Sequence, residues 1–388
     1  MSNLLLESTP ILELAHLLSG QLSPKCVEKE NWPEIVKMAL DHGVGGMLLW
    51  SLRKASWQCI LESNCQPLID SARRSGRHSL LLDKVRSQSA TALDRLEIPS
   101  IWLKGICLAH TYYPEAHLRP MVDLDVLVPG DRLHSAHEEL LKLGFQPAEE
   151  DFFELAGFTE EARHHVCLKD RTSRVKVDLH FRLLVPAVIN RLDKDLLDWF
   201  WTQTYELSSD GPSFRALKPE ANLLYLCAHA ILQNQGEPLD LLHLLDLHMI
   251  ITRSNLDWNL IMEQATILNW TDAVTQALSM LPILFGTHLP EVMINELQNN
   301  HSKYGLPLLS LDPLQTTRRW DDWSSAFRQM STRKRIRLIW LTVFPPGVFL
   351  RQQYHLSPNQ VLLPYYISHL IDGGREAVRA LIGINKAT

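Results

Sequence analysis

The sequence has few cysteines and no long hydrophobic run. Its 388 residues include six cysteines, and none of them stands in a CxxC pair. So sparse a set is typical of reduced thiols in a cytoplasmic protein, not of a secreted disulfide scaffold. The longest apolar stretches, 223–232 and 338–350, are interrupted by His229 and by Pro345-Pro346. Both fall short of the roughly 18–20 residues that a membrane-spanning helix needs, so no membrane association is expected.

The sequence also lacks a signal peptide, a basic excess and low-complexity segments. The first residues carry Glu7 and Glu13 and no basic n-region. Lys and Arg number 38 against 44 Asp and Glu, so the formal net charge is −6, and 46% of residues are hydrophobic. This composition excludes intrinsic disorder and nucleic-acid binding through overall charge. We expect a folded cytoplasmic protein of two or three domains.

One local basic cluster stands apart from this balance. It could be a solvated helix face, or a surface for phosphate or nucleic acid. Its members are Arg328, Arg333, Lys334, Arg335 and Arg337.

The periodicity of apolar residues divides the chain into three parts. Residues 1–96 are predicted to be helical, including a helix over about 76–96. Residues 97–185 show strand and helix patterns in alternation, and residues 186–388 return to the helical period. The sequence therefore predicts an α+β fold with a small mixed sheet, flanked by N-terminal helices and a large C-terminal helical region.

Two predicted strands place carboxylates on one face. The strand over 121–128 alternates so that Asp123 and Asp125 project to the same side, about 6–7 Å apart. In the hairpin predicted over 164–183, Asp178 lies on the polar face of the second strand. Two anions aimed together repel unless a cation joins them, and Mg²⁺ takes such oxygen ligands. If the strands pair, three carboxylates could hold two metal ions for an in-line phosphoryl displacement, with Asp178 as the base.

Cationic and histidine side chains flank these carboxylates. A short strand over 98–103 leads into Lys104-Gly105 at a helix start, where an ammonium and backbone amides could meet a phosphate. Arg119, four residues before Asp123, could hold a phosphate with two hydrogen bonds. His180 shares the face of Asp178, and it could touch substrate, orient a carboxylate or make a structural hydrogen bond.

Two further pairs of residues, each containing histidine, leave alternatives open. His164 and His165 occupy adjacent strand positions that face opposite ways, so at most one is expected to reach the carboxylates. His243 and Asp246 stand three residues apart on a predicted helix. They could form a buried pair at a helix contact or touch a substrate.

The motifs together resemble those of a known family. The segments are IWLKG, YYPEAHLRPMVDLDVLV, LLKLGF and VKVDLHFRL, followed by LLYLCAHAILQ, LLHLLDLHMI, VFPPGVFLRQQYHLS and LLPYYISHL. They resemble the bacterial uncharacterised nucleotidyltransferase family of the DNA polymerase β-like superfamily. The resemblance implies a polymerase β-like core over 97–185, with Asp123, Asp125 and Asp178 as metal carboxylates. It also implies Mg²⁺ or Mn²⁺ and a nucleoside triphosphate (NTP) such as ATP. The superfamily usually has Gly-Ser after its first strand, where this chain has Lys104-Gly105.

The expected activity is metal-dependent transfer of a nucleoside monophosphate from an NTP to an acceptor hydroxyl or phosphate, with release of pyrophosphate. Asp123 and Asp125 would hold the metals, Asp178 would complete the site, and Lys104 and Arg119 would neutralise triphosphate charge. A small molecule or peptide is the expected acceptor. Two alternatives remain: a toxin-like or regulatory modifier of tRNA or protein that uses the same site, and a catalytically silent nucleotide-binding or scaffold protein.

Overall fold

The structure is a computed structural model that describes most of the chain. The described residues are 9–55, 62–148, 163–184, 194–208, 213–233, 239–304, 331–354, 356–357 and 359–371. The chain divides into two compact units. The first comprises Met1–Gln146, His165–Leu184 and Arg191–Thr316, and the second comprises Pro147–His164, Val185–Asn190 and Thr317–Thr388.

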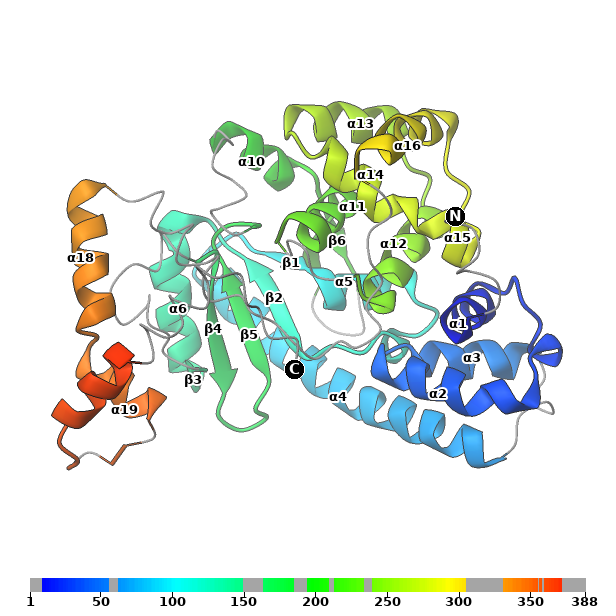
Figure 1. Ribbon diagram of the computed structural model, residues 1–388. Helices are drawn as coiled ribbons and strands as arrows, with labels where there is room; N and C mark the ends of the chain where they lie inside the picture. The colour runs from blue at the N-terminus through cyan, green and yellow to red at the C-terminus, as the bar shows by residue number, and fades with distance from the viewer. Residues whose placement is uncertain are drawn as a thin grey trace. The chain divides into compact units, whose positions relative to one another are not determined.

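Helices open the first unit, as expected. They are α1 (Pro10–Ser19), α2 (Trp32–Asp41), α3 (Gly45–Ala55) and α4 (Glu62–Arg95) (Figure 1). The predicted helix over 76–96 forms the C-terminal part of α4. Its N-terminal part, which contains Pro67, lies within residues 1–96, the part expected to be helical, although no separate helix was predicted there. Short 3-10 helices lie between the longer elements of the chain. They are η1 (Pro24–Cys26), η2 (Lys29–Asn31), η4 (Ala116–Leu118) and η5 (Gly130–Arg132).

A seven-stranded mixed sheet forms the centre of this unit. Its order is β3-β4-β5-β2-β1-β7-β6. The strands are β1 (Ile101–Leu103), β2 (Asp123–Leu127), β3 (Phe145–Pro147), β4 (His165–Asp170), β5 (Lys176–His180), β6 (Thr204–Leu207) and β7 (Phe214–Leu217). The strands predicted from the sequence are confirmed as β1, β2, β4 and β5. β6 and β7, which lie in the part expected to be helical, extend the sheet beyond β1.

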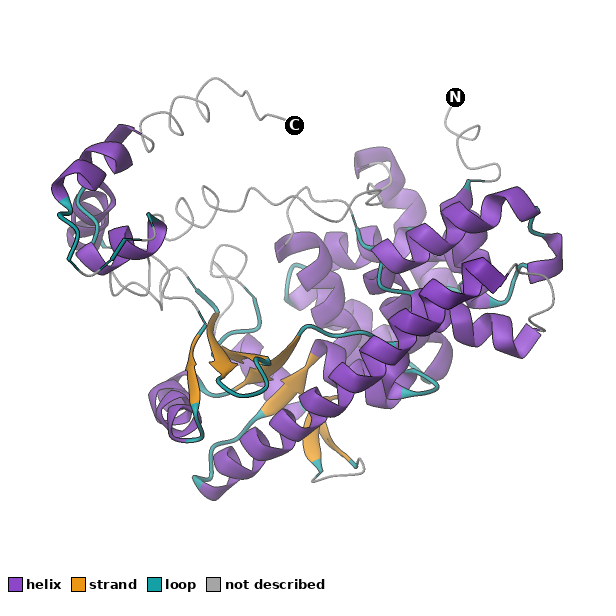
Figure 2. Cartoon of the chain, turned by 90° about the horizontal axis from the view of Figure 1, so that it is seen from below, coloured by secondary structure: helices purple, strands orange, loops and turns teal. Residues whose placement is uncertain are grey.

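One face of the sheet is covered by helices. Leu124 and Val126 of β2, with Val177 and Leu179 of β5, pack into a buried cluster against α4, α5 (Lys104–Tyr112) and α6 (Leu133–Lys142). Figure 2 shows the long helix α4 running alongside the strands. Because side chains alternate along a strand, the residues between these apolar ones face the other side of the sheet.

The other helices of the first unit flank β6 and β7 in the chain. They are α10 (Lys194–Thr202) before β6, then α11 (Pro219–Ala228), a π-helical turn (His229–Gln233), α12 (Leu241–Arg253), α13 (Trp258–Ile267), α14 (Thr271–Ser279), α15 (Leu281–Phe285) and α16 (Glu291–Tyr304). The predicted helices over 240–250, 256–268 and 272–284 are confirmed. Among the described residues, no helix combines the length and the apolar character needed to cross a bilayer.

The second unit contributes α18 (Thr332–Val343) and α19 (Gly347–Gln353) to the described part of the chain. α18 carries most of the basic cluster, and Arg333, Lys334 and Arg337 are exposed on it. Arg328, the remaining member, lies outside the described residues.

Candidate active site

Three carboxylates stand on the sheet face opposite the helical core. β2 carries Asp123 and Asp125 two residues apart, which places both side chains on the same face. β5 runs parallel to β2, and its Asp178 pairs in register with Asp125. Neighbouring strands lie about 4.8 Å apart, so Asp125 and Asp178 are immediate neighbours. The structure thus brings together the three carboxylates that the sequence pattern singled out.

Asp125 is the most firmly held of the three. It is buried, and its Oδ1 lies 2.7 Å from Nζ of Lys104 and 2.8 Å from Nε2 of His180. A carboxylate can only accept hydrogen bonds, so both nitrogens donate, and His180 carries a proton on Nε2. Of the roles considered for His180, orientation of a carboxylate is the one that this geometry supports.

The position of Lys104 follows from the turn between β1 and α5. Leu103 ends β1 and pairs with Asp125 on the antiparallel β2, so the next residue is already close to that carboxylate. Lys104 has a φ of 48°, in the left-handed region that side chains other than Gly, Asn and Asp rarely adopt. The following Gly105 has no room for a side chain, because a Cβ there would lie 2.7 Å from Nη1 of Arg119 and 2.7 Å from Cγ of Met121.

The pKa of Asp125 is shifted in the opposite direction from the pKa values of Asp123 and Asp178. Burial, together with the charges of Asp125 and Asp178, raises the pKa of Asp123 to about 7. Burial and Asp125 also raise the pKa of Asp178. Burial acts in the same sense on Asp125, but Lys104 and His180 outweigh it and hold the pKa of Asp125 well below its usual range. Two of the three carboxyl groups therefore give up their protons reluctantly unless more positive charge arrives.

The donor atoms fit a divalent cation. Oδ1 of Asp178 is buried and has no hydrogen-bond partner within the described part of the chain. Ligand atoms of Asp125, Asp178 and His180 all lie within 4.8 Å of one another, and the pKa of Asp123 responds to both other carboxylates. Clustered carboxylate oxygens are the ligands that Mg²⁺ and Mn²⁺ prefer. A cation here would satisfy the orphaned oxygen and reduce the repulsion.

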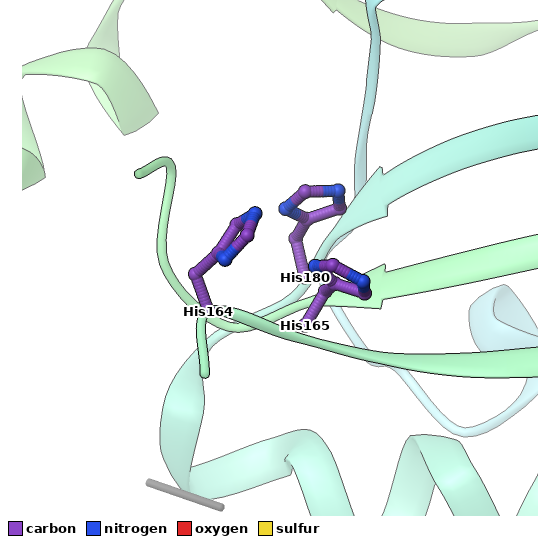
Figure 3. Close-up of side chains that lie close together, drawn as sticks. All are labelled: His164, His165 and His180. Carbon is purple, nitrogen blue, oxygen red and sulfur yellow. The ribbon is translucent and has the colours of Figure 1, made fainter. Parts of the chain in front are cut away.

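Histidines border the carboxylates along β4 and β5. Nε2 of His165 lies 3.7 Å from Oδ2 of Asp178, and the rings of His165 and His180 have centroids 5.1 Å apart. Figure 3 shows both rings together with that of His164, and one nitrogen of each of the three lies within 4.8 Å of the others. His165 therefore reaches a carboxylate, whereas the neighbours given for His164 are the rings of His165 and His180, so the expectation that at most one of the two reaches the carboxylates stays a prediction. His164 precedes the first residue of β4, so strand alternation does not apply to it.

Arg119 is engaged by a partner that the sequence did not indicate. Its Nη2 lies 2.8 Å from Oδ2 and its Nε 3.2 Å from Oδ1 of Asp246 on α12. The hydroxyl of Tyr113 donates to the same Oδ1 at 2.7 Å. Both charged groups are buried, and Nη1 of Arg119 also donates to the carbonyl of Pro120. The contact between Arg119 and a phosphate stays a prediction. The side chain of Arg119 is held by these hydrogen bonds, and its Nη1 lies beside Gly105.

Of the two roles considered for His243 and Asp246, a buried pair and a substrate contact, the first gives way to other partners for both residues. Asp246 bonds to Arg119 and Tyr113, whereas Nδ1 of His243 lies 3.8 Å from Oδ2 of Asp240. Three-residue spacing on a helix permits a pair, but a buried guanidinium on another element offers two charge-assisted hydrogen bonds.

Two aromatic residues near Lys104, Tyr225 and His229, were given no role in the site by the sequence reasoning. Tyr225 is buried on α11, with its hydroxyl close to the ammonium of Lys104. His229 begins the π-helical turn, and its ring lies 6.0 Å from that of Tyr225. Burial and the charge of Lys104 lower the pKa of His229 well below its ordinary value. The only signal in the sequence was two polar rings four residues apart in an otherwise apolar helix.

Comparison with known proteins places the site in context. A family model described as "Uncharacterised nucleotidyltransferase" matches residues 28–286, a span that contains all seven candidate site residues. No curated protein matches the chain. A solved structure described as an antigenic nucleotidyltransferase-like protein from Paracoccidioides brasiliensis is 17% identical, with a TM-score of 0.36. The match covers 55% of this chain and 96% of that one, a similarity too low to compare the two sites.

Proposed function

Because the chain belongs to the uncharacterised nucleotidyltransferase family, we propose that it transfers a nucleoside monophosphate from an NTP to an acceptor hydroxyl or phosphate, with a divalent metal ion. The class of enzyme, a nucleotidyltransferase, comes with the family. The metal, the nucleotide and the acceptor class, a small molecule or peptide, are our proposal.

The observation that carries this proposal is the pairing of Asp125 with Asp178 on adjacent parallel strands, with Asp123 two residues away. Three carboxylates at one place on a sheet are costly without a cation, as the raised pKa values of Asp123 and Asp178 indicate. A structural role would be served better by apolar or paired side chains. The cost is offset when the carboxylates bind a cation that itself binds a triphosphate.

The proposed roles follow from the contacts. Asp123, Asp125 and Asp178 would hold Mg²⁺ or Mn²⁺, which when bound supplies charge neutralisation to the triphosphate. His180 donates to Asp125 and keeps that carboxylate ionised and oriented. Lys104 precedes Gly105, and the guanidinium of Arg119 lies beside Gly105 in space. Their positive charges would reduce the electrostatic repulsion between a triphosphate and the carboxylates.

Asp178 is the proposed base for the acceptor. The acceptor oxygen bonds to the α-phosphorus, and the bond between the α-phosphorus and the bridging oxygen breaks, so pyrophosphate leaves with the electron pair. When the acceptor is a hydroxyl, its proton passes to the carboxylate of Asp178. A base whose pKa is raised toward neutrality holds that proton more readily than an ordinary aspartate.

The test uses α- and γ-labelled NTPs with Mg²⁺ and mixtures of small alcohols, phosphorylated metabolites and short peptides. We expect product labelled only from the α position, with pyrophosphate released, and no product after chelation. Asp123→Asn and Asp125→Asn should abolish transfer, whereas Asp131→Asn, which removes an exposed carboxylate, should not. Label from the γ position alone would identify a kinase and refute the proposal. If both site variants remained active, the residue assignment would be wrong.

A tRNA or protein acceptor is the second candidate, because α18 exposes Arg333, Lys334 and Arg337 along one helix. Addition of tRNA to the same assay tests this candidate. Labelled tRNA whose yield falls steeply with salt would favour a nucleic-acid substrate. A silent scaffold protein, in contrast, would show no metal-dependent thermal stabilisation by any NTP.

A further inference from the structure

The ammonium of Lys104 is bound to Asp125, one of the three carboxylates, where a metal ion would bind in a two-metal site. Its Nζ lies 2.7 Å from Oδ1 of Asp125, and its side chain is only 21% exposed. The same oxygen accepts from Nε2 of His180 at 2.8 Å. A carboxylate oxygen has two lone pairs, so these two donors use the whole capacity of Oδ1.

The ammonium is built into this position by the backbone. Leu103 is paired with Asp125 across the β1–β2 ladder, and Lys104 follows it with a φ of 48°. That conformation is unfavourable for lysine, and a strained backbone persists where the surrounding structure holds it. The hydroxyl of Tyr225 on α11 is buried and has no hydrogen-bond partner among the described residues, and the charge of Lys104 counteracts the rise in its pKa that burial causes.

The balance of charge favours a single metal ion. Oδ1 of Asp178 is buried and has no hydrogen-bond partner among the described residues, so it is open to a cation. The two positive charges of one divalent ion and the single charge of one ammonium balance the three negative charges of the carboxylates. A second ion at Oδ1 of Asp125 would have to displace a hydrogen-bonded ammonium from a buried anion, and breaking such a pair is strongly unfavourable.

We propose that Lys104 is a built-in cation that stands in for one of the two divalent ions a three-carboxylate site can hold, so that this enzyme works with one metal ion. The inference rests on the proposed function, and it makes Lys104 a positioning residue of Asp125 rather than a mobile phosphate ligand. It accounts for a lysine where the superfamily usually has Gly-Ser.

The test counts bound Mn²⁺. Full-length protein at a fixed concentration is mixed with an equal amount of the α,β-methylene analogue of one NTP at a time and titrated with Mn²⁺, and the ions bound by the same analogue without protein are subtracted. The free ion is followed by electron paramagnetic resonance. We expect one tightly bound ion per chain in the natural protein and two in the Lys104→Gly variant. Glycine adopts a φ of 48° without strain, so this variant retains the turn, and Lys104→Asn provides a second variant that tolerates the same conformation.

The control is Arg174→Gly. Arg174 also has a positive φ of 64°, but it is an exposed residue in the turn between β4 and β5, so the variant removes a cation from a left-handed position outside the site. We expect it to bind one ion, as the natural protein does, and to keep its activity.

Three outcomes overturn the inference. Two bound ions in the natural protein would show that Lys104 yields to a metal. An unchanged count in both Lys104 variants, with weaker binding of the methylene nucleotide, would make the lysine a phosphate ligand. Absence of Mn²⁺ binding in every variant would refute the metal-dependent function itself, and the α-label assay would then fail as well. The count in the natural protein decides the question even where a variant does not fold.

Discussion

Replacement of Asp123 by asparagine should stabilise the metal-free protein above neutral pH while it abolishes transfer. An unfolded aspartate titrates near 3.8, whereas burial and the charges of Asp125 and Asp178 raise the pKa of Asp123 to about 7 in the folded chain. Between these pH values the folded state holds a proton that the unfolded state has released. The stability conferred by this group is therefore fully present below pH 3.8 and is lost as the pH rises through 7.

The size of this loss follows from the pKa difference. One pKa unit corresponds to about 1.4 kcal/mol, so a rise of about three units costs about 4 kcal/mol once Asp123 is ionised. An asparagine has nearly the same shape and no charge, so the Asp123→Asn protein escapes that cost. At low pH, where Asp123 is protonated, the two proteins should unfold with nearly equal free energies.

Urea unfolding of metal-free protein, measured at about pH 5 and at about pH 8, tests this difference. The free energy of unfolding of the natural protein should fall more steeply between the two conditions than that of the Asp123→Asn variant, by about 3 kcal/mol, because about two pH units separate pH 5 from the folded pKa of about 7. Mg²⁺ should restore the stability of the natural protein at the higher pH and leave the variant less affected. Asp131→Asn, at an exposed carboxyl, should follow the natural protein. Parallel pH profiles for the natural protein and the Asp123→Asn variant, or a less stable variant at pH 8, would refute the electrostatic argument.

Three other substitutions probe how the site is held. Asp246→Asn leaves the buried guanidinium of Arg119 without its counter-ion, and urea unfolding should show a loss of about 3–5 kcal/mol. Gly105→Ala places a Cβ 2.7 Å from Nη1 of Arg119, and the same measurement should show a loss of about 1–3 kcal/mol. His180→Ala removes a donor from Asp125, so Mn²⁺ titration should show an affinity lower by about 10–100-fold.

Matched positions elsewhere separate these effects from general damage. Glu263→Gln neutralises an exposed carboxylate on α13, and it should leave stability unchanged. Gly76→Ala, within α4, meets its nearest atom at 3.9 Å and should be neutral or slightly stabilising. His134→Gln alters a histidine whose side chain is 85% exposed. If any of these matched its site counterpart, the corresponding contact would not explain the loss.

Alternation along strands was sufficient to predict the carboxylate face. The apolar residues of β2 and β5 must face the helical core, so Asp123, Asp125 and Asp178 could only project to the other side. That Asp178 would lie beside Asp125 required one further assumption, namely that the two strands pair, and the register confirms it. Local pattern and charge repulsion therefore identified the three carboxylates without any knowledge of the loops between them.

The partners of the cations could not be predicted in this way. Arg119 and Asp246 stand 127 positions apart in sequence, and nothing in the spacing of either residue points to the other. Lys104 was expected at a phosphate because it opens a helix, yet it reaches Asp125 because Leu103 is paired with that residue across the sheet. Such contacts depend on how elements are packed in three dimensions, and that packing leaves no period in the sequence.

β6 and β7 were missed for a related reason. Their four residues each are too few to show alternation, and they lie between the amphipathic helix α10 and the mostly apolar helix α11. They form strands because β1 offers an open edge to β7, and β7 in turn pairs with β6. Tertiary context outweighed local preference here.

The parallel pairing of β1 with β7 has a consequence for how the protein folds during synthesis. Trp102 of β1 finds its partner, Ala216, only after more than a hundred further residues have been made. Until then the strand that leads to Lys104 has a bare edge, and bare edges recruit other chains. We expect a nascent or truncated chain that ends before β7 to aggregate, even though it already contains every candidate site residue. The shortest independently folding piece around the carboxylates should therefore extend from α4 beyond β7, at least to α12, whose Asp246 pairs with the buried Arg119.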